Sequence, residues 1–212
     1  MIKYLFFDFD GTICDSRSNA EISLIRTLDK FECDFNHSKA ISLLGDKINI
    51  TLQKVCEGEE RVNKIAKYFH KQFTKENLID VRPCVPLNYL YRLSKKYKMI
   101  IISNSDKKHI VKALNKLKIK KLFKKVYGAQ NFSTKDEMLT KLIKKYKINQ
   151  KEAVYIGDRF SDIRYAKKAG CISIAMSNSC SWSDKKTLKK EKPDYFVKDF
   201  VELGRLLDKI NK

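Results

Sequence analysis

The chain has 212 residues, of which 43% are hydrophobic, so it can bury a sizeable core and is not a disordered, low-complexity protein. It carries 45 Lys and Arg residues against 25 Asp and Glu, a net charge of +20, and 37 of the basic residues are lysines. Because bidentate contacts to phosphate favour arginine, this lysine excess points to a solvated surface rather than to a nucleic-acid site.

The N-terminus lacks the basic segment, the apolar stretch and the cleavage site of a signal peptide, and no apolar run approaches the about 18 residues of a membrane span. The six cysteines form no C-x-x-C pair and have no histidine partners at zinc-ligand spacing, as is typical of proteins from a reducing compartment. We therefore expect a soluble cytoplasmic protein with no membrane partner.

The first predicted element is an apolar strand at 2–7, and two acids follow it, Asp8 and Asp10. An unpaired buried carboxylate costs several kcal/mol or becomes protonated. The pair therefore needs a cation, hydrogen-bond donors or a functional reason to lie at the end of a core strand.

Residues 16–80 come next and keep helical apolar spacing throughout, with no convincing strand. They hold 11 basic and 10 acidic residues, so this segment is almost neutral. We predict an all-helical cap over 16–80, inserted after the first strand, and an α/β core domain formed by 1–15 and 81–212.

After Pro83 and Pro86, predicted strands and helices alternate to the end of the chain. The strands are 99–102, 126–128, 153–156, 171–175 and 195–197, and the helices are 87–97, 110–117, 137–146 and 163–169. This order predicts a Rossmann-like parallel sheet with helices on both faces.

The charge is concentrated in one part of this alternating region. Residues 92–151 hold 19 basic and 3 acidic residues. Solvated helix faces explain this best, and a surface for a polyanion is the alternative. Such a surface would bind nucleic acid tightly and with a steep dependence on salt.

Polar residues follow several of the predicted strands, where ligands of open parallel sheets bind. Ser103 and Asn104 follow the strand at 99–102, and Asp158 follows the strand at 153–156, with Asp162 four residues on. Lys135 lies in STKDE, where Thr134 can cap a helix and Glu137 holds the capping-box position.

This combination is suited to phosphoryl transfer. Carboxylates can hold Mg²⁺, which prefers oxygen ligands, and one carboxylate can attack phosphorus. A hydroxyl, an ammonium group and backbone N–H groups can neutralise the phosphoryl oxygens, while a second carboxylate protonates the leaving group and then activates water.

The four motifs, taken in order, resemble the haloacid dehalogenase superfamily, and specifically its phosphoglycolate phosphatase-like members with a helical C1-type cap. The motifs are DFDGT (8–12), SN (103–104), Lys135 and GDRFSD (157–162). The resemblance covers essentially the whole chain, including PDYFVKDFVEL near its end. One departure is Asp136, since the family usually has proline after this lysine.

The resemblance implies a role for each matching residue. Asp8 would be the nucleophile and a magnesium ligand, and Asp10 the general acid and base with its backbone carbonyl on the metal. Asp158, together with Asp162 directly or through water, would complete the metal shell.

The remaining matches would serve the substrate. Ser103 and Lys135 would bind the phosphate, with Thr12 and Asn104 supporting the site. The cap segment 42–52 is expected to face the site, with Gly45 at a helix break and Asp46, Lys47 and Asn49 as polar candidates. The three histidines are expected to be surface or structural residues, and Trp182 to pack in the core.

The sequence therefore favours a magnesium-dependent phosphatase of small phosphorylated metabolites, acting as a monomer or a homodimer. Asp10 argues against a dehalogenase, which needs no acid to protonate a leaving halide. A sugar phosphomutase shares every motif and stays open as an alternative. A noncatalytic polyanion-binding protein would account for the lysines but not for the four matched acids, so we expect nucleic acid not to be the partner.

Overall fold

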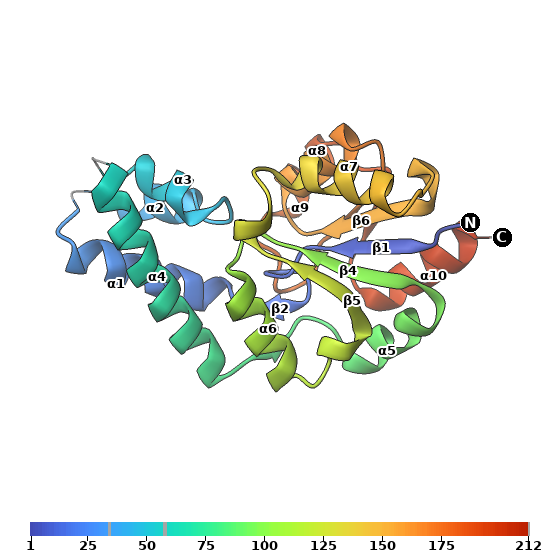
Figure 1. Cartoon of the computed structure of the whole chain (residues 1–212), viewed down its shortest axis with the longest axis horizontal. Coiled ribbons are helices and arrows are strands. Elements are labelled where there is room, and N and C mark those ends of the chain that lie inside the picture. Colours follow the sequence, from blue (N-terminus) through green and yellow to red (C-terminus); the bar gives the residue numbers. More distant parts are fainter. Residues whose placement is uncertain (34, 57–58, 212) are drawn as a thin grey trace.

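The computed structural model describes residues 1–33, 35–56 and 59–211. At its centre is a parallel six-stranded sheet with the strand order β5-β4-β1-β6-β7-β8 (Figure 1). The strands are β1 (Tyr4–Phe7), β4 (Lys98–Ile102), β5 (Phe123–Tyr127), β6 (Ala153–Gly157), β7 (Ile172–Met176) and β8 (Tyr195–Val197). All six predicted strands are present, and the predicted fold class is confirmed.

Strand β1 lies between β4 and β6, with Phe7 in register with Ile101 on one side and Ile156 on the other. All four of its residues are buried, because helices cover both faces of a parallel sheet. The carboxyl ends of these three strands therefore meet at one edge, and they carry three of the four motifs.

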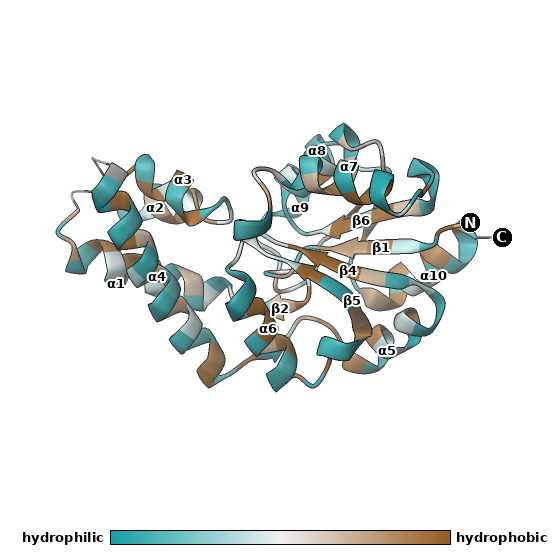
Figure 2. Cartoon of the chain, in the orientation of Figure 1, coloured by the Kyte–Doolittle hydropathy of each residue, from teal (hydrophilic) through white to brown (hydrophobic). Residues whose placement is uncertain are grey.

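Helices pack on both faces of the sheet, and the strands between them are largely apolar (Figure 2). One face is covered by α5 (Leu87–Lys96), α6 (Lys107–Lys116) and α10 (Phe200–Ile210). The other face is covered by α7 (Lys135–Lys145) and α8 (Phe160–Lys168), with α9 (Lys185–Lys190) beside α8. Three short 3-10 helices lie in the connections: η1 (Lys120–Leu122), η2 (Ala129–Asn131) and η3 (Gln150–Glu152).

Several predicted boundaries are wrong in a consistent way. Helices α6 and α8 begin at Lys107 and Phe160, before the predicted starts at 110 and 163. Apolar spacing likewise placed the start of α7 at 137, whereas the predicted Thr134 cap correctly indicated a start at Lys135. The first turn of each helix is largely polar, so apolar spacing does not reveal it. Strand β5 begins at Phe123 rather than at the predicted 126. Apolar spacing missed this start because two exposed lysines follow Phe123 and interrupt the apolar pattern.

The described residues of 17–79 form helices with a hydrophobic cluster of their own, beside the carboxyl edge of the sheet (Figure 1). The helices are α1 (Arg17–Lys30), α2 (His37–Ser42), α3 (Ile48–Gln53) and α4 (Glu59–Ile79). The predicted helical insertion is thereby confirmed as part of the fold class, while the division into domains at 15/16 and 80/81 stays a prediction.

A short antiparallel pair lies where the chain enters and leaves this helical segment. It joins β2 (Cys14–Asp15) to β3 (Arg82–Pro83), and the sequence did not predict it. Strands of two residues are too short to show alternation. Among the described residues, none of the helices combines the length and apolar character that a membrane-spanning segment requires.

Candidate active site

Three carboxylates meet at the carboxyl edge of the sheet. Asp8 follows β1, Asp158 follows β6, and Asp162 lies in the first turn of α8. One oxygen from each lies within 4.8 Å of the others, and all three residues are buried. Such a group of hard oxygen ligands is suited to a divalent cation.

Lys135 is the first residue of α7 and joins two of these acids. Its Nζ lies 2.9 Å from Asp8 Oδ2 and 2.7 Å from Asp162 Oδ1, and the side chain is only 2% exposed. Thr134 is the N-cap of α7, as predicted, but its hydroxyl makes no capping hydrogen bond. The helix start thus places an ammonium group among the acids.

Burial raises the pKa of Asp8 to about 7, although the neighbouring Lys135 lowers it. Burial also raises the pKa of Asp158, and repulsion from Asp8 and Asp162 adds to this. For Lys135, burial alone would lower the pKa, but the two carboxylates outweigh it and raise the pKa. Three buried acids thus share one cation, an imbalance that a divalent metal ion would relieve.

Asp158 is fixed by two donors. It accepts hydrogen bonds from Thr12 Oγ1 at 2.8 Å and from the backbone N–H of Trp182 at 2.7 Å. Gly11 lies directly against it with φ +74°, and a Cβ there would stand 2.3 Å from Asp158 Oδ2. A side chain at position 11 would therefore displace the carboxylate, so DFDGT needs its glycine.

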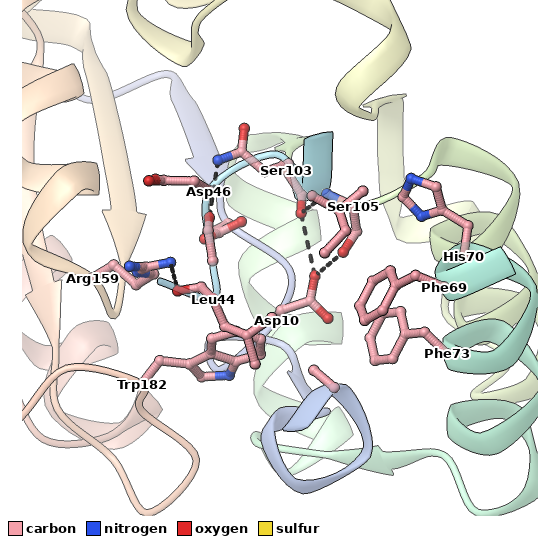
Figure 3. A pocket seen from close by; sticks show the side chains of 15 residues that line it. Asp10, Leu44, Asp46, Phe69, His70, Phe73, Ser103, Ser105, Arg159 and Trp182 are labelled. Carbon is pink, nitrogen blue, oxygen red and sulfur yellow. Dashed lines mark hydrogen bonds between the residues drawn. The ribbon is translucent and has the colours of Figure 1, made fainter. Parts of the chain in front are cut away.

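Asp10 stands apart from this acid cluster and is held by hydroxyl groups. Ser16 Oγ donates to it at 2.6 Å. Ser105 Oγ donates to it at 2.5 Å and Ser103 Oγ at 3.4 Å (Figure 3). Its carboxyl group lines a cavity between the sheet edge and the helical segment. Three donors on one carboxylate fix its orientation toward whatever occupies that cavity.

The cavity has a volume of about 50 Å³ and both parts of the fold line it. Asp8, Asp10, Ser103, Asn104, Ser105, Arg159 and Trp182 come from the sheet side, and Ala20, Leu44, Gly45, Asp46, Ile48, Phe69, His70 and Phe73 come from the helical segment. It is therefore a small, two-sided site with Asp8 and Asp10 on the sheet side and Asp46 on the helical side.

Residues 43–47, here named the cap loop, accept hydrogen bonds at two backbone carbonyls from side chains that follow strands of the sheet. Asn104 Nδ2 donates to Gly45 O at 3.0 Å, and Arg159 Nη1 donates to Leu44 O. Asn104 and Arg159 each directly follow a proposed site residue in the sequence. The strand ends that carry the acids and the serine thus also hold the cap loop in place.

Lys47 anchors the other end of the cap loop. Its Nζ donates to Ala129 O at 2.8 Å and to Phe132 O, and it lies 4.9 Å from the centre of the Phe132 ring. It is not among the residues that line the cavity. Asn49, in α3, donates to Asn63 instead, so of the four candidates predicted in segment 42–52 only Gly45 and Asp46 line the cavity.

Gly45→Ala should lower kcat/KM by about 10- to 100-fold, because small misplacements at a closing site have large kinetic effects. Gly45 has φ +101°, which strains any side chain, and an added Cβ would stand 1.1 Å from Arg159 Nη1, so Arg159 would have to leave the carbonyl of Leu44 that it holds. Steady-state kinetics would measure the loss. Gly204→Ala is the matched control, since its Cβ meets nothing within 4 Å. Unchanged kinetics in Gly45→Ala would refute the role of this contact.

Comparison with known proteins agrees with this geometry. Residues 5–176 match the haloacid dehalogenase-like hydrolase family. The chain belongs to this family. It is 24% identical to the phosphoglycolate phosphatase of Aquifex aeolicus (strain VF5), over 98% of this chain and 97% of that protein. It is 22% identical to the pyrophosphatase PpaX of Bacillus mycoides (strain KBAB4), over 99% of each.

Solved structures share the fold over almost the whole chain. A haloacid dehalogenase-like family hydrolase from Streptococcus pneumoniae superposes with a TM-score of 0.81 at 19% identity, covering 97% of this chain and 98% of that one. A hydrolase from Pseudomonas syringae gives a TM-score of 0.84 at 17% identity, covering 99% of both chains. At these identities the likeness concerns the fold.

The structure brings together most of the residues that the haloacid dehalogenase resemblance selected. Asp8, Asp158 and Asp162 lie within 4.8 Å of one another through one oxygen each, and Lys135 contacts Asp8 and Asp162. Ser103 donates a hydrogen bond to Asp10. Thr12 is fully buried and supports Asp158 rather than lining the cavity.

Four cavity residues with polar groups were given no site role by the sequence: Ser105, Arg159, His70 and Trp182. Ser105 directly follows the SN motif and Arg159 lies within GDRFSD, so proximity in sequence could have suggested them. His70 and Trp182 carry no such signal, because only the packing of α4 and of the 177–184 connection brings them to the cavity.

Proposed function

We propose that the protein is a magnesium-dependent phosphatase of small phosphorylated metabolites that acts through a phosphoaspartate on Asp8. One observation carries the proposal: Asp8, Asp158 and Asp162 form a buried cluster joined by Lys135, and Asp10 lines the same cavity as Asp8. Relatives named phosphoglycolate phosphatase and pyrophosphatase, similar along their whole length, support it.

The acid cluster fits a Mg²⁺ ion. Its donors are carboxylate oxygens, which this ion prefers, and the buried acids outnumber the cations around them. Asp8, Asp158 and Asp162 would hold the ion, together with the backbone carbonyl of Asp10 as the family resemblance implies. When bound, it would neutralise charge on the phosphoryl oxygens.

In the proposed reaction, an Asp8 oxygen attacks phosphorus and the bond to the leaving oxygen breaks. Protonated Asp10 gives its proton to that oxygen, so the alcohol leaves neutral and Asp10 becomes a carboxylate. Asp10 then takes a proton from water, whose oxygen attacks the phosphorus on Asp8, and phosphate and free Asp8 result. Ser103 and Lys135 bind the phosphoryl oxygens in both steps.

The test is a screen of phosphorylated metabolites with added Mg²⁺ in isotopically labelled water. A phosphatase should release labelled phosphate at the rate of substrate loss. Isomerised sugar phosphate with little labelled phosphate would identify a phosphomutase instead, in which the closed cavity keeps water from the phosphoaspartate. Full turnover in excess chelator would refute the metal dependence.

Mg²⁺ binding should release more protons at about pH 6.5 than at about pH 8.5. Burial raises the pKa of Asp8 from 3.8 to about 7 in the metal-free protein, so this acid is mostly protonated at the lower pH, and the metal binds its carboxylate form. Calorimetric titration in two buffers of different ionisation enthalpy measures the release. Asp8→Asn should release fewer protons at about pH 6.5, and equal release would contradict the assignment.

The same pKa shift affects the stability of the metal-free protein. Between pH 3.8 and about 7 the unfolded chain gives up the Asp8 proton before the folded one does. The contribution of Asp8 to the free energy of unfolding is therefore fully present below this window and is lost as the pH rises through it.

A further inference from the structure

Arg159 is the only lysine or arginine among the described residues that line the cavity. It is buried and is the N-cap of α8. His70 also lines the cavity, but burial lowers its pKa below the usual 6.5, with Asp106 opposing the shift only in part. Because that imidazole is neutral at physiological pH, Arg159 supplies the one permanent positive charge of the cavity wall.

No described carboxylate neutralises this charge. Arg159 Nη1 donates to the carbonyl of Leu44, which is neutral, and the buried Nε has no hydrogen-bond partner. Asp46 lines the same cavity, yet none of the ion pairs among the described residues includes Arg159. The ring of Phe160, whose centre lies 5.6 Å from Cζ, offers only a weak cation–π contact.

Neither water nor the loss of a proton relieves the buried charge. Arg159 also lines an outer cleft of about 450 Å³, together with Leu44 and Trp182, but only 7% of the residue is exposed. A guanidinium keeps its proton in proteins, unlike a buried lysine or histidine. An unpaired buried cation is costly, so an anion that binds during function is the expected partner.

The position of the guanidinium indicates which part of a substrate it would meet. It lies against the cap loop, to which it donates its hydrogen bond (Figure 3). In the proposed reaction the transferred phosphoryl group lies against Asp8, Ser103 and Lys135, on the sheet side. The rest of the substrate then extends toward the helical segment, whose cap loop forms part of the facing wall. Arg159 is therefore placed to meet the leaving group.

The other charged side chains that line the cavity are acids: Asp8, Asp10 and Asp46. Asp46, and Asp10 when it is ionised, would repel an anion on the leaving group. Arg159 is therefore the group that decides whether a substrate with such an anion can bind.

We propose that Arg159 is a specificity-determining residue whose guanidinium binds an anionic group, a carboxylate or a second phosphate, on the leaving group of the substrate. The planar guanidinium matches both kinds of anion through parallel N–H donors. This inference rests on the proposed phosphatase function, and it implies that esters without such a group are turned over less well.

The first test compares three esters with the wild-type protein and Mg²⁺. Phosphoglycolate and isobutyl phosphate have leaving groups with the same number of non-hydrogen atoms, and only the first is anionic. Ethane-1,2-diol bisphosphate carries a second phosphate instead of the carboxylate. At least one anionic ester should show a kcat/KM at least about tenfold higher than isobutyl phosphate, and the better of the two identifies the anion. If neither exceeds isobutyl phosphate, the inference is overturned.

Arg159→Met then separates recognition from structure. It should lower kcat/KM for the favoured anionic ester at least about 30-fold more than for isobutyl phosphate, because the anion loses its charged partner. A purely structural role at the cap loop, or contact with the transferred phosphoryl group, would lower both values equally and would overturn the inference. Arg164→Met, the matched control, removes an exposed arginine of α8 that pairs with Glu191 and should leave the ratio unchanged.

Binding to Asp8→Asn tests the same inference without turnover. With Mg²⁺ present, adding Arg159→Met to this variant should raise the Kd of phosphoglycolate or of ethane-1,2-diol bisphosphate at least about 30-fold, measured by calorimetry, and change that of isobutyl phosphate little. Equal effects on all three esters would contradict the inference. If no ester released phosphate from the wild type, the proposed function would fail, while the binding comparison would still decide whether Arg159 holds the anion.

Discussion

Asp8→Asn is expected to lower kcat by at least about 10⁴-fold, because asparagine has nearly the same shape but cannot form the covalent intermediate. The fold should survive the change. In the metal-free protein burial raises the pKa of Asp8 to about 7, so at about pH 8 the folded chain holds an unfavourable charge that asparagine removes. Without metal, the variant should therefore unfold at the same or a higher temperature than the wild type.

Phosphate release with saturating Mg²⁺ and thermal unfolding without it would together measure both effects. Asp29→Asn makes the same chemical change at an exposed position of α1 and should leave turnover unaltered. Wild-type turnover by Asp8→Asn would refute the nucleophile assignment. If the variant lost its turnover because it no longer folded, the expectation that it is at least as stable as the wild type would be wrong.

Lys135→Met is expected to lower kcat/KM by about 10²- to 10³-fold, since an ammonium group that stabilises the phosphoryl oxygens is removed. It should also lower the free energy of unfolding of the metal-free protein by about 3 kcal/mol at about pH 8, because breaking a buried ion pair leaves uncompensated charge. The charge concerned is that of Asp8 and Asp162, which Lys135 contacts at 2.9 and 2.7 Å.

Magnesium should restore much of the stability that Lys135→Met loses, but not the activity. Denaturant unfolding with and without Mg²⁺, alongside steady-state kinetics, separates the two effects. Lys144→Met changes an exposed lysine of the same helix and should alter neither. If Lys135→Met were as active as the wild type, Lys135 would have only a structural role.

Much of this architecture was predictable from the local pattern of apolar and acidic residues in the sequence. The strands at 4–7 and 153–157 are continuous apolar runs followed at once by acids, so both their burial and their place at the sheet edge could be expected. Lys135 was found through motif order, although 37 lysines make any single one inconspicuous.

The contacts of the cap loop were not predictable in the same way. Lys47 was expected at the site, but it reaches Ala129 and Phe132, which are distant in sequence and have no motif of their own. His70 is one polar residue on a long helix, and its place in the cavity depends on how α4 packs. Such contacts depend on how the helical segment packs against the sheet side. Apolar periodicity within one segment does not predict this packing.

The antiparallel pair β2–β3 has a consequence for how this protein can change over evolutionary time. Asp15 pairs with Arg82 and Cys14 with Pro83, so the helical segment leaves and re-enters at neighbouring points. The segment between them is a long insertion whose two ends are held together by this pair. The entropic cost of closing such a loop grows only slowly with its length. Helices could be lengthened, shortened or exchanged at this junction without altering the register of the six-stranded sheet. New substrate preferences can thus arise by grafting at 15 and 82 while the acids at the sheet edge stay where they are.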